Sequence, residues 1–219
     1  VRPLFPHEAE QGEFGVISCG ADGRIAVHET QLPRGVGFDG TLETHAFQAQ
    51  HVFDASADND GVFGHSVLPL VEFALGGGQG TAFMFGQTGS GKTYTMGSAA
   101  DGHDGDRGII PRAIQEIFAR IGALKATHRF SLRISFLEIY NEELRDLLDT
   151  TKGKVLRVRE DENGSASVQG AEEEKVTSAE QMMEALRRGS LVRTPPWLTS
   201  RGEGAARSRR RISAARDSP

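Results

Sequence analysis

The stretch from Phe83 to Gly97, FMFGQTGSGKTYTMG, decides the fold class of this chain. Its centre, Gly86 to Thr93, matches the pattern G-x-x-x-x-G-K-[ST], in which a glycine-rich turn lets backbone N–H groups come close to phosphate oxygens. The preceding run, Thr81 to Phe85, is short and apolar, which predicts a strand buried on both faces of an α/β sheet. The residues after the loop are compatible with a helix. We therefore predict a nucleotide-binding loop between a strand and a helix.

Each residue type in this loop has a separate role in binding a triphosphate. Backbone amides that point inward, together with the free N–H groups at the start of the next helix, favour an anion. Lys92 would reach the β and γ phosphates, and the Thr93 hydroxyl would complete the coordination shell of a Mg²⁺ ion. The predicted site residues of the loop are Gly86, Gln87, Thr88, Gly89, Ser90, Gly91, Lys92 and Thr93.

Hydrolysis needs further groups, and the sequence offers none that we can assign. An acidic residue that ends an apolar strand should hold Mg²⁺ through water, and another group should place the attacking water. Asp54 follows His51-Val52-Phe53, which we predict to be a short strand end, but Asp54 is better explained as the cap of the next turn. Asp146 and Asp149 fit solvated charges on a helix face. The catalytic residues are therefore left unassigned.

Composition limits the class of protein. A chain of 219 residues with 37% hydrophobic residues can form a core, and its length suits one domain or one and a half. Its one cysteine, Cys19, excludes an internal disulfide and favours a reducing, intracellular compartment. Neither a signal peptide nor a membrane span is indicated by any apolar stretch.

Periodicity predicts the remaining elements. Apolar residues at helical spacing predict a helix over Val62 to Leu75, which Pro69 should kink or shorten, and a second helix behind Pro111. Alternation predicts a strand over residues 130–136 and a hairpin over residues 156–169, with its turn at Asn163-Gly164. A last helix is predicted to begin with a capping box at Ser178 and Gln181 and to end near Gly189.

The composition changes at Pro195. Residues 195–219 are rich in Arg, Ser, Ala and Gly, and we expect this segment to be a basic, disordered tail after a domain that spans residues 1–194. Six arginines against Glu203 and Asp217 would also fit a nucleic-acid contact, which would show a steep salt dependence. Because short basic ends are common, we do not expect nucleic acid to be the partner.

Three segments in this order resemble the kinesin motor domain. They are FGQTGSGKTYTMG, then GIIPRAIQEIF (Gly108 to Phe118), then SFLEIYNEELRDLLD (Ser135 to Asp149), and the likeness extends from Val1 to about Thr194. VRPLFPHE and REDENG are most similar to the chromokinesin branch. A P-loop kinase or another NTPase would have no reason to carry the second and third segments.

The resemblance implies a fold, an activity and further site residues. It implies an α/β, P-loop NTPase-type kinesin motor core with a central mixed sheet flanked by helices, and a microtubule-stimulated ATPase with ATP and Mg²⁺ as cofactors. In the family, an arginine–proline pair at the first strand and the residue after GKT contact adenine, which implies that Arg2, Pro3 and Tyr94 do so here. Microtubules are the implied partner, the cytoplasm and cytoskeleton the implied location, and dimerisation through regions outside this chain is implied as well.

The sequence also departs from the family pattern. After Thr194 the family's N-x-x-S-S-R-S-H and D-L-A-G-S-E switch motifs do not follow, so we expect a motor domain truncated before its switches. A truncated gene model and a real short isoform both fit, and so does a nucleotide-binding remnant without motility. The hairpin at Asn163 has no Lys or Arg between Arg159 and Lys175, which argues against microtubule binding by this fragment alone. In the family, the strand that carries the second switch would pair beside Thr81 to Phe85, and the sequence lacks it. We therefore expect this chain to be poorly soluble or only partly folded, to bind ATP weakly if at all, and to show no microtubule-stimulated turnover.

Overall fold

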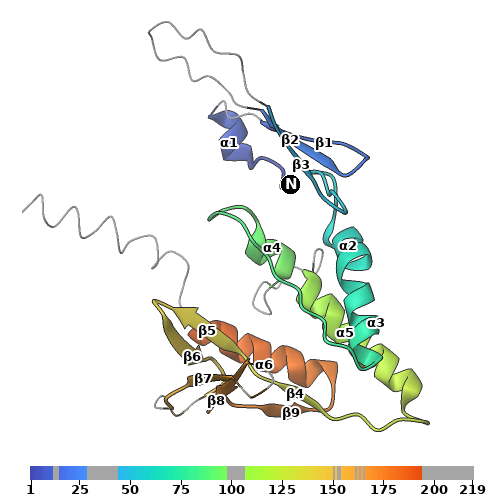
Figure 1. Cartoon of the computed structure of the whole chain (residues 1–219), viewed down its shortest axis with the longest axis vertical. Coiled ribbons are helices and arrows are strands. Elements are labelled where there is room, and N and C mark those ends of the chain that lie inside the picture. The colour runs from blue at the N-terminus through green and yellow to red at the C-terminus, as the bar shows by residue number, and fades with distance from the viewer. Residues whose placement is uncertain are drawn as a thin grey trace, which may run out of the picture. The chain divides into compact units, whose positions relative to one another are not determined.

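The computed structural model describes residues 1–11, 15–28, 44–97, 107–149, 151, 154–160, 162, 164 and 166–193. The chain divides into two compact units, Val1–Leu124 and Lys125–Pro219, which we describe separately (Figure 1). The predicted turn residue Asn163 and the predicted basic tail lie outside the described residues, and so does the boundary at residue 194.

The first unit begins with a short helix and a small antiparallel sheet. The helix α1 (Pro6–Glu10) starts with proline at its first position, where a missing N–H is tolerated. The sheet has the order β1-β2-β3, built from β1 (Ile17–Cys19), β2 (Arg24–His28) and β3 (Thr44–Gln48). The predicted strand end at His51 to Asp54 is wrong, because those residues lie outside any strand.

A helical segment follows, and a proline interrupts it as predicted. It consists of α2 (Asn59–Val62), the π-helical turn η1 (Phe63–Val67) and α3 (Leu68–Leu75). Pro69 lies in the first turn of α3, and because it has no N–H to donate, the regular α-helical bonding cannot run unbroken through this point. The π-helical turn η1, which is wider than an α-helical turn, lies immediately before α3 at this change in bonding.

The core of the first unit lies between this segment and α5 (Ile109–Leu124). Val67, Val71 and Ile109 are buried together, and partly buried apolar side chains pack around them. Within α5, Ile114 and Ile121 are also buried, which confirms the predicted apolar stripe behind Pro111. Figure 1 shows α3 and α5 lying side by side.

The predicted strand at Thr81 to Phe85 is wrong. The chain from residue 79 to residue 86 belongs to no helix or strand, and Phe83 and Phe85 are 79% and 95% exposed. A strand needs a hydrogen-bonded neighbour, and none of the described strands pairs with this run. An apolar sequence with high strand propensity is therefore left extended, with Met84 alone half-buried.

The second unit consists of paired strands and one long helix. The elements are β4 (Leu132–Ile134), β5 (Leu137–Tyr140), β6 (Glu143–Asp146), β7 (Arg157–Glu160), β8 (Ala166–Gln169), β9 (Glu174–Val176) and α6 (Ala179–Val192). The pairs are β4 with β9, β5 with β6, and β7 with β8, all antiparallel. The pairing of β7 with β8 confirms the predicted hairpin.

Two predictions in this unit need correction. The segment LEIYNEELRD is a hairpin with Asn141 and Glu142 at positive φ, 49° and 64°, so Asp146 ends a strand and does not lie on a helix face. Asp149 follows two residues of turn and is not helical either. Helix α6 begins at the predicted N-cap, where Ser178 accepts from the N–H of Gln181, but it continues through Gly189 to Val192.

Gly189 is a packing residue and not a helix end. A Cβ at this position would lie 2.3 Å from Cδ1 of Phe136, so the missing side chain is what lets α6 approach the strand segment. Ala185, one turn earlier on the same face, is fully buried. The described residues contain both helices and sheets, and every strand pair among them is antiparallel.

Candidate nucleotide-binding site

The phosphate loop is held at both ends by the core of the first unit. Met84, just before the loop, and Met96, at the end of α4 (Lys92–Met96), both pack against the buried cluster of Val67, Val71 and Ile109. Behind α4, the backbones of Gly97 and Gly108 touch so closely that a Cβ on Gly108 would lie 2.2 Å from the nitrogen of Gly97. The loop therefore spans two fixed points.

The loop itself has a backbone that only glycine adopts readily. Gly86, Gly89 and Gly91 have φ values of 155°, 83° and 90°, and Gly91 is the N-cap of α4. A Cβ on Gly86 would lie 2.5 Å from the hydroxyl oxygen of Ser90, so a larger residue would fill the concave side of the turn. At these three positions the turn is therefore bare backbone, without side chains.

Lys92 closes the loop. Its ammonium group donates to the carbonyl oxygens of Gly86 and Gln87, both at 2.7 Å, and the N–H of Ser90 donates to the carbonyl of Gln87 at 3.2 Å. The cation is therefore held on two carbonyl oxygens of the turn. Gln87, Thr88 and Gly89 form the exposed tip, and the side chain of Thr93 is exposed.

Arg2 reaches the same loop, although the sequence places it far away. Its Nε donates to the carbonyl oxygen of Gly89 at 2.9 Å, and its two Nη atoms donate to the carboxylate of Glu8 at 2.7 and 2.6 Å. Arg2 and the N–H of Phe5 together lower the pKa of Glu8 to about 2, with the hydrogen bond from Arg2 as the largest cause. No signal in the sequence singled out Glu8.

The other two residues assigned to adenine are less constrained. Pro3 is exposed, and Tyr94 is 61% exposed on α4. The backbone carbonyl of Tyr94 accepts from the amide of Asn59 at 3.5 Å, and Asn59 is the buried polar residue that links α2 to α4. The structure thus brings Arg2 into direct contact with the loop. The side chains of Pro3 and Tyr94 lie in the same unit and are exposed.

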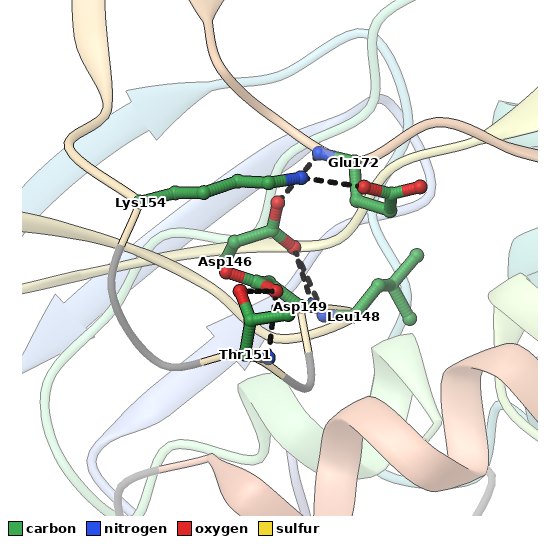
Figure 2. Close-up of polar contacts among 6 residues, drawn as sticks. All are labelled: Asp146, Leu148, Asp149, Thr151, Lys154 and Glu172. Carbon is green, nitrogen blue, oxygen red and sulfur yellow. Dashed lines mark hydrogen bonds and ion pairs between the residues drawn. The ribbon is translucent and has the colours of Figure 1, made fainter.

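The carboxylates considered for catalysis have structural partners. Asp54 accepts from the N–H and hydroxyl of Ser56 at 2.8 and 2.6 Å, which confirms that Asp54 caps the turn. The same bonds, above all the one from the hydroxyl, lower the pKa of Asp54. Asp146 and Asp149 lie in a polar network of the second unit, shown in Figure 2. Within the described residues, no group of three or more His, Cys, Asp or Glu side chains is arranged to hold a metal ion.

A glycine-rich loop followed by a lysine and a threonine, in an α/β chain, defines the P-loop NTPase type of fold. Within that class the chain belongs to the kinesin motor domain family, since the family model described as "Kinesin motor domain" matches residues 1–208. The predicted membership of the chromokinesin branch stays a prediction.

Individual relatives agree with this assignment. The chain is 43% identical over 150 residues to "Kinesin-like protein KIF27" of Rattus norvegicus, which covers 67% of this chain and 11% of the relative. It is 36% identical over 193 residues to "Kinesin heavy chain" of Botryotinia fuckeliana, covering 88% of this chain and 20% of that one. The chain therefore spans between about a tenth and a fifth of the length of these relatives.

A solved structure is similar in fold as well as in sequence. It is described as "Structure of a fast kinesin: Implications for ATPase mechanism and interactions with microtubules". The TM-score is 0.74 at 33% sequence identity, and the match covers 86% of this chain and 50% of the other. Among the described residues, none of the helices is long and apolar enough to span a membrane.

Proposed function

We propose that residues Gly86 to Thr93 bind the triphosphate of ATP with Mg²⁺, and that the whole protein is a microtubule-stimulated ATPase that drives movement along microtubules. The observation that carries the first part is the closed loop, in which the Lys92 ammonium lies on the carbonyls of Gly86 and Gln87. Family membership supports the second part. Microtubules are the proposed partner, the cytoskeleton is the proposed location, and further regions would provide dimerisation.

The residues of the loop would act by position and charge. Backbone amides of the turn surround the β phosphate, and Lys92 exchanges its two carbonyl acceptors for phosphate oxygens. The exposed hydroxyl of Thr93 would hold Mg²⁺, which would offset the negative charge of the β and γ phosphates. Pro3 and Tyr94 are the proposed contacts of the adenine. The resemblance implied Arg2 as well, but its nitrogens donate to Glu8, the carbonyl of Pro3 and the carbonyl of Gly89, so we assign Arg2 to the loop.

Titration of the full chain with a fluorescent ATP analogue in the presence of Mg²⁺ tests the site. We expect Lys92→Ala to weaken binding at least about tenfold, because charge-assisted hydrogen bonds to the phosphates are lost. Lys125→Ala is the matched control, since Lys125 is an exposed lysine beyond the end of α5. Thr93→Asn should mainly reduce the benefit of Mg²⁺. Equal affinity of Lys92→Ala and the unsubstituted chain would remove the site.

A nucleotide-binding protein without motility is the second candidate. The extended run before the loop favours it, because Phe83 and Phe85 are 79% and 95% exposed and pair with no described strand. A run that belongs to no sheet lacks the hydrogen bonds to neighbouring strands through which a change at the phosphate loop would reach other strands. Phosphate release by the 219-residue chain, measured with and without microtubules, separates the two candidates: stimulation supports the motor, and its absence supports the second candidate for this chain.

A further inference from the structure

One guanidinium group joins helix α1 to the tip of the phosphate loop. The two Nη atoms of Arg2 donate to the two carboxylate oxygens of Glu8 at 2.7 and 2.6 Å. The remaining nitrogen, Nε, donates to the carbonyl oxygen of Gly89 at 2.9 Å. These bonds use all three nitrogens of the side chain, and one Nη also donates to the carbonyl oxygen of Pro3 at 2.8 Å. The orientation of Arg2 is therefore set by Glu8 and Pro3 on one side and by the loop on the other.

Further contacts hold this arrangement in place. The carboxylate of Glu8 also accepts from the N–H of Phe5 at 2.7 Å, which ties the acid to the start of its own helix. The guanidinium carbon of Arg2 lies 4.3 Å from the centre of the Phe5 ring. The side chains of Arg2 and Glu8 are 29% and 23% exposed, so solvent screens their ion pair less than it would a fully exposed one. Bidentate geometry adds directional constraint to the charge.

The bond to Gly89 acts on a peptide group of the loop. A peptide unit is planar, so holding the carbonyl oxygen of Gly89 also sets the direction of the N–H of Ser90. That N–H donates to the carbonyl of Gln87 at 3.2 Å, across the turn. Gly89 has a φ of 83° and no side chain of its own, so the rotation of this peptide is limited mainly by the bond from Arg2 and the bond from Ser90 to Gln87.

We propose that Glu8 is a positioning residue for the phosphate loop, because it orients Arg2 so that Arg2 fixes the Gly89–Ser90 peptide before a phosphate binds. This inference rests on the proposed nucleotide site. A loop that is ordered in advance loses less entropy when it binds, so the effect of Glu8 is on phosphate affinity. Because the contact is to the loop backbone, it applies to a triphosphate whether or not a base is attached.

The experiment compares Glu8→Gln with Glu10→Gln in the full chain. Glu10 is the matched control, because it is an exposed acid at the end of the same helix. Without ligand, we expect backbone NMR order parameters of Gly89 and Ser90 to fall from about 0.85 to below about 0.6 in Glu8→Gln and to stay unchanged in Glu10→Gln. The dissociation constants of Mg²⁺-ATP and of Mg²⁺-tripolyphosphate should rise together, about threefold to tenfold.

Each outcome supports or overturns the proposal. A loss for ATP without a loss for tripolyphosphate would mean that Arg2 acts on the base, and unchanged order parameters would mean that Glu8 does not order the loop. Binding of neither ligand by the unsubstituted chain would overturn the proposed function, while the order parameters would still decide the positioning role. Arg2→Lys is the second variant. It keeps the positive charge but loses the planar guanidinium that binds Glu8 and Gly89 together, so its order parameters and dissociation constants should match those of Glu8→Gln.

Discussion

Asp146 and Asp149 differ in how many of their carboxylate oxygens the fold uses (Figure 2). Asp146 accepts from the N–H of Leu148 at 2.9 Å through one oxygen and from the N–H of Glu172 at 2.6 Å through the other. Both bonds of Asp149, from the N–H and hydroxyl of Thr151, go to a single oxygen. An amide keeps one acceptor oxygen and loses the other, so the two residues should respond differently to the same substitution.

We predict that Asp146→Asn destabilises the chain by about 1–3 kcal/mol, since an NH₂ group would replace an oxygen that accepts from the backbone. Asp149→Asn is the matched control and should change stability by less than about 0.5 kcal/mol. Urea unfolding followed by circular dichroism measures both. Equal losses in the two variants would contradict the assignment of the second oxygen of Asp146 to Glu172.

Single residues were predictable from the sequence where their role depends on near neighbours. The turn from Gly86 to Lys92 folds on itself, so the motif was enough to expect a glycine-rich loop there, although the bonds of Lys92 to the carbonyls of Gly86 and Gln87 were not predicted. The contact of Arg2 with Gly89 spans 87 positions, and the bond of Asp146 with Glu172 spans 26. Long-range partners of this kind leave no local pattern that a reader of the sequence could use.

Two helical glycines show what packing adds at the scale of the element. Gly189 in α6 is buried, and a Cβ there would meet Cδ1 of Phe136 at 2.3 Å and Cβ of Leu147 at 3.3 Å. A Cβ on Gly122 in α5 would meet no atom within 4 Å outside the nearby backbone of its own helix. The intrinsic gain from replacing glycine by alanine in a helix is about 1 kcal/mol for both, so packing alone distinguishes them.

We predict that Gly122→Ala stabilises the chain by up to about 1 kcal/mol and that Gly189→Ala destabilises it by about 1–2 kcal/mol, because overpacking exceeds the helical gain. Thermal and urea unfolding of the two variants would be compared with the unsubstituted chain. A stabilising Gly189→Ala would show that Phe136 moves aside at little cost, and that α6 does not depend on the close approach.

Helices were more predictable than strands for a physical reason. The hydrogen bonds of α5 lie within the helix, so its apolar period and Pro111 were sufficient to place it. A strand depends on a partner elsewhere in the chain, which is why Thr81 to Phe85 has strand composition without strand structure. The hairpin of β5 and β6 was missed because Glu142 takes a positive φ that glutamate seldom adopts.

At the scale of the whole molecule, the described strands form small antiparallel sheets. They are one sheet of three strands and three separate pairs, of which β4 with β9 joins residues 132–134 to residues 174–176. The family likeness nevertheless covers residues 1–208. Apolar surface that a central sheet would cover is therefore exposed on this chain, most strongly next to the phosphate loop at Phe83 and Phe85.

We predict that the 219-residue chain self-associates through this run, since an unpaired extended segment offers both backbone groups and apolar side chains to a second copy. The double substitution Phe83→Ser and Phe85→Ser should raise the concentration at which association begins by at least about tenfold, because burial of each ring contributes about 1.5–3 kcal/mol. Ile139→Ser is the matched control: Ile139 is 75% exposed, but its strand β5 is already paired with β6. Sedimentation velocity over a concentration series measures the effect. If the unsubstituted chain stays monomeric, or if the double variant associates equally, this run is not the surface through which the chain self-associates.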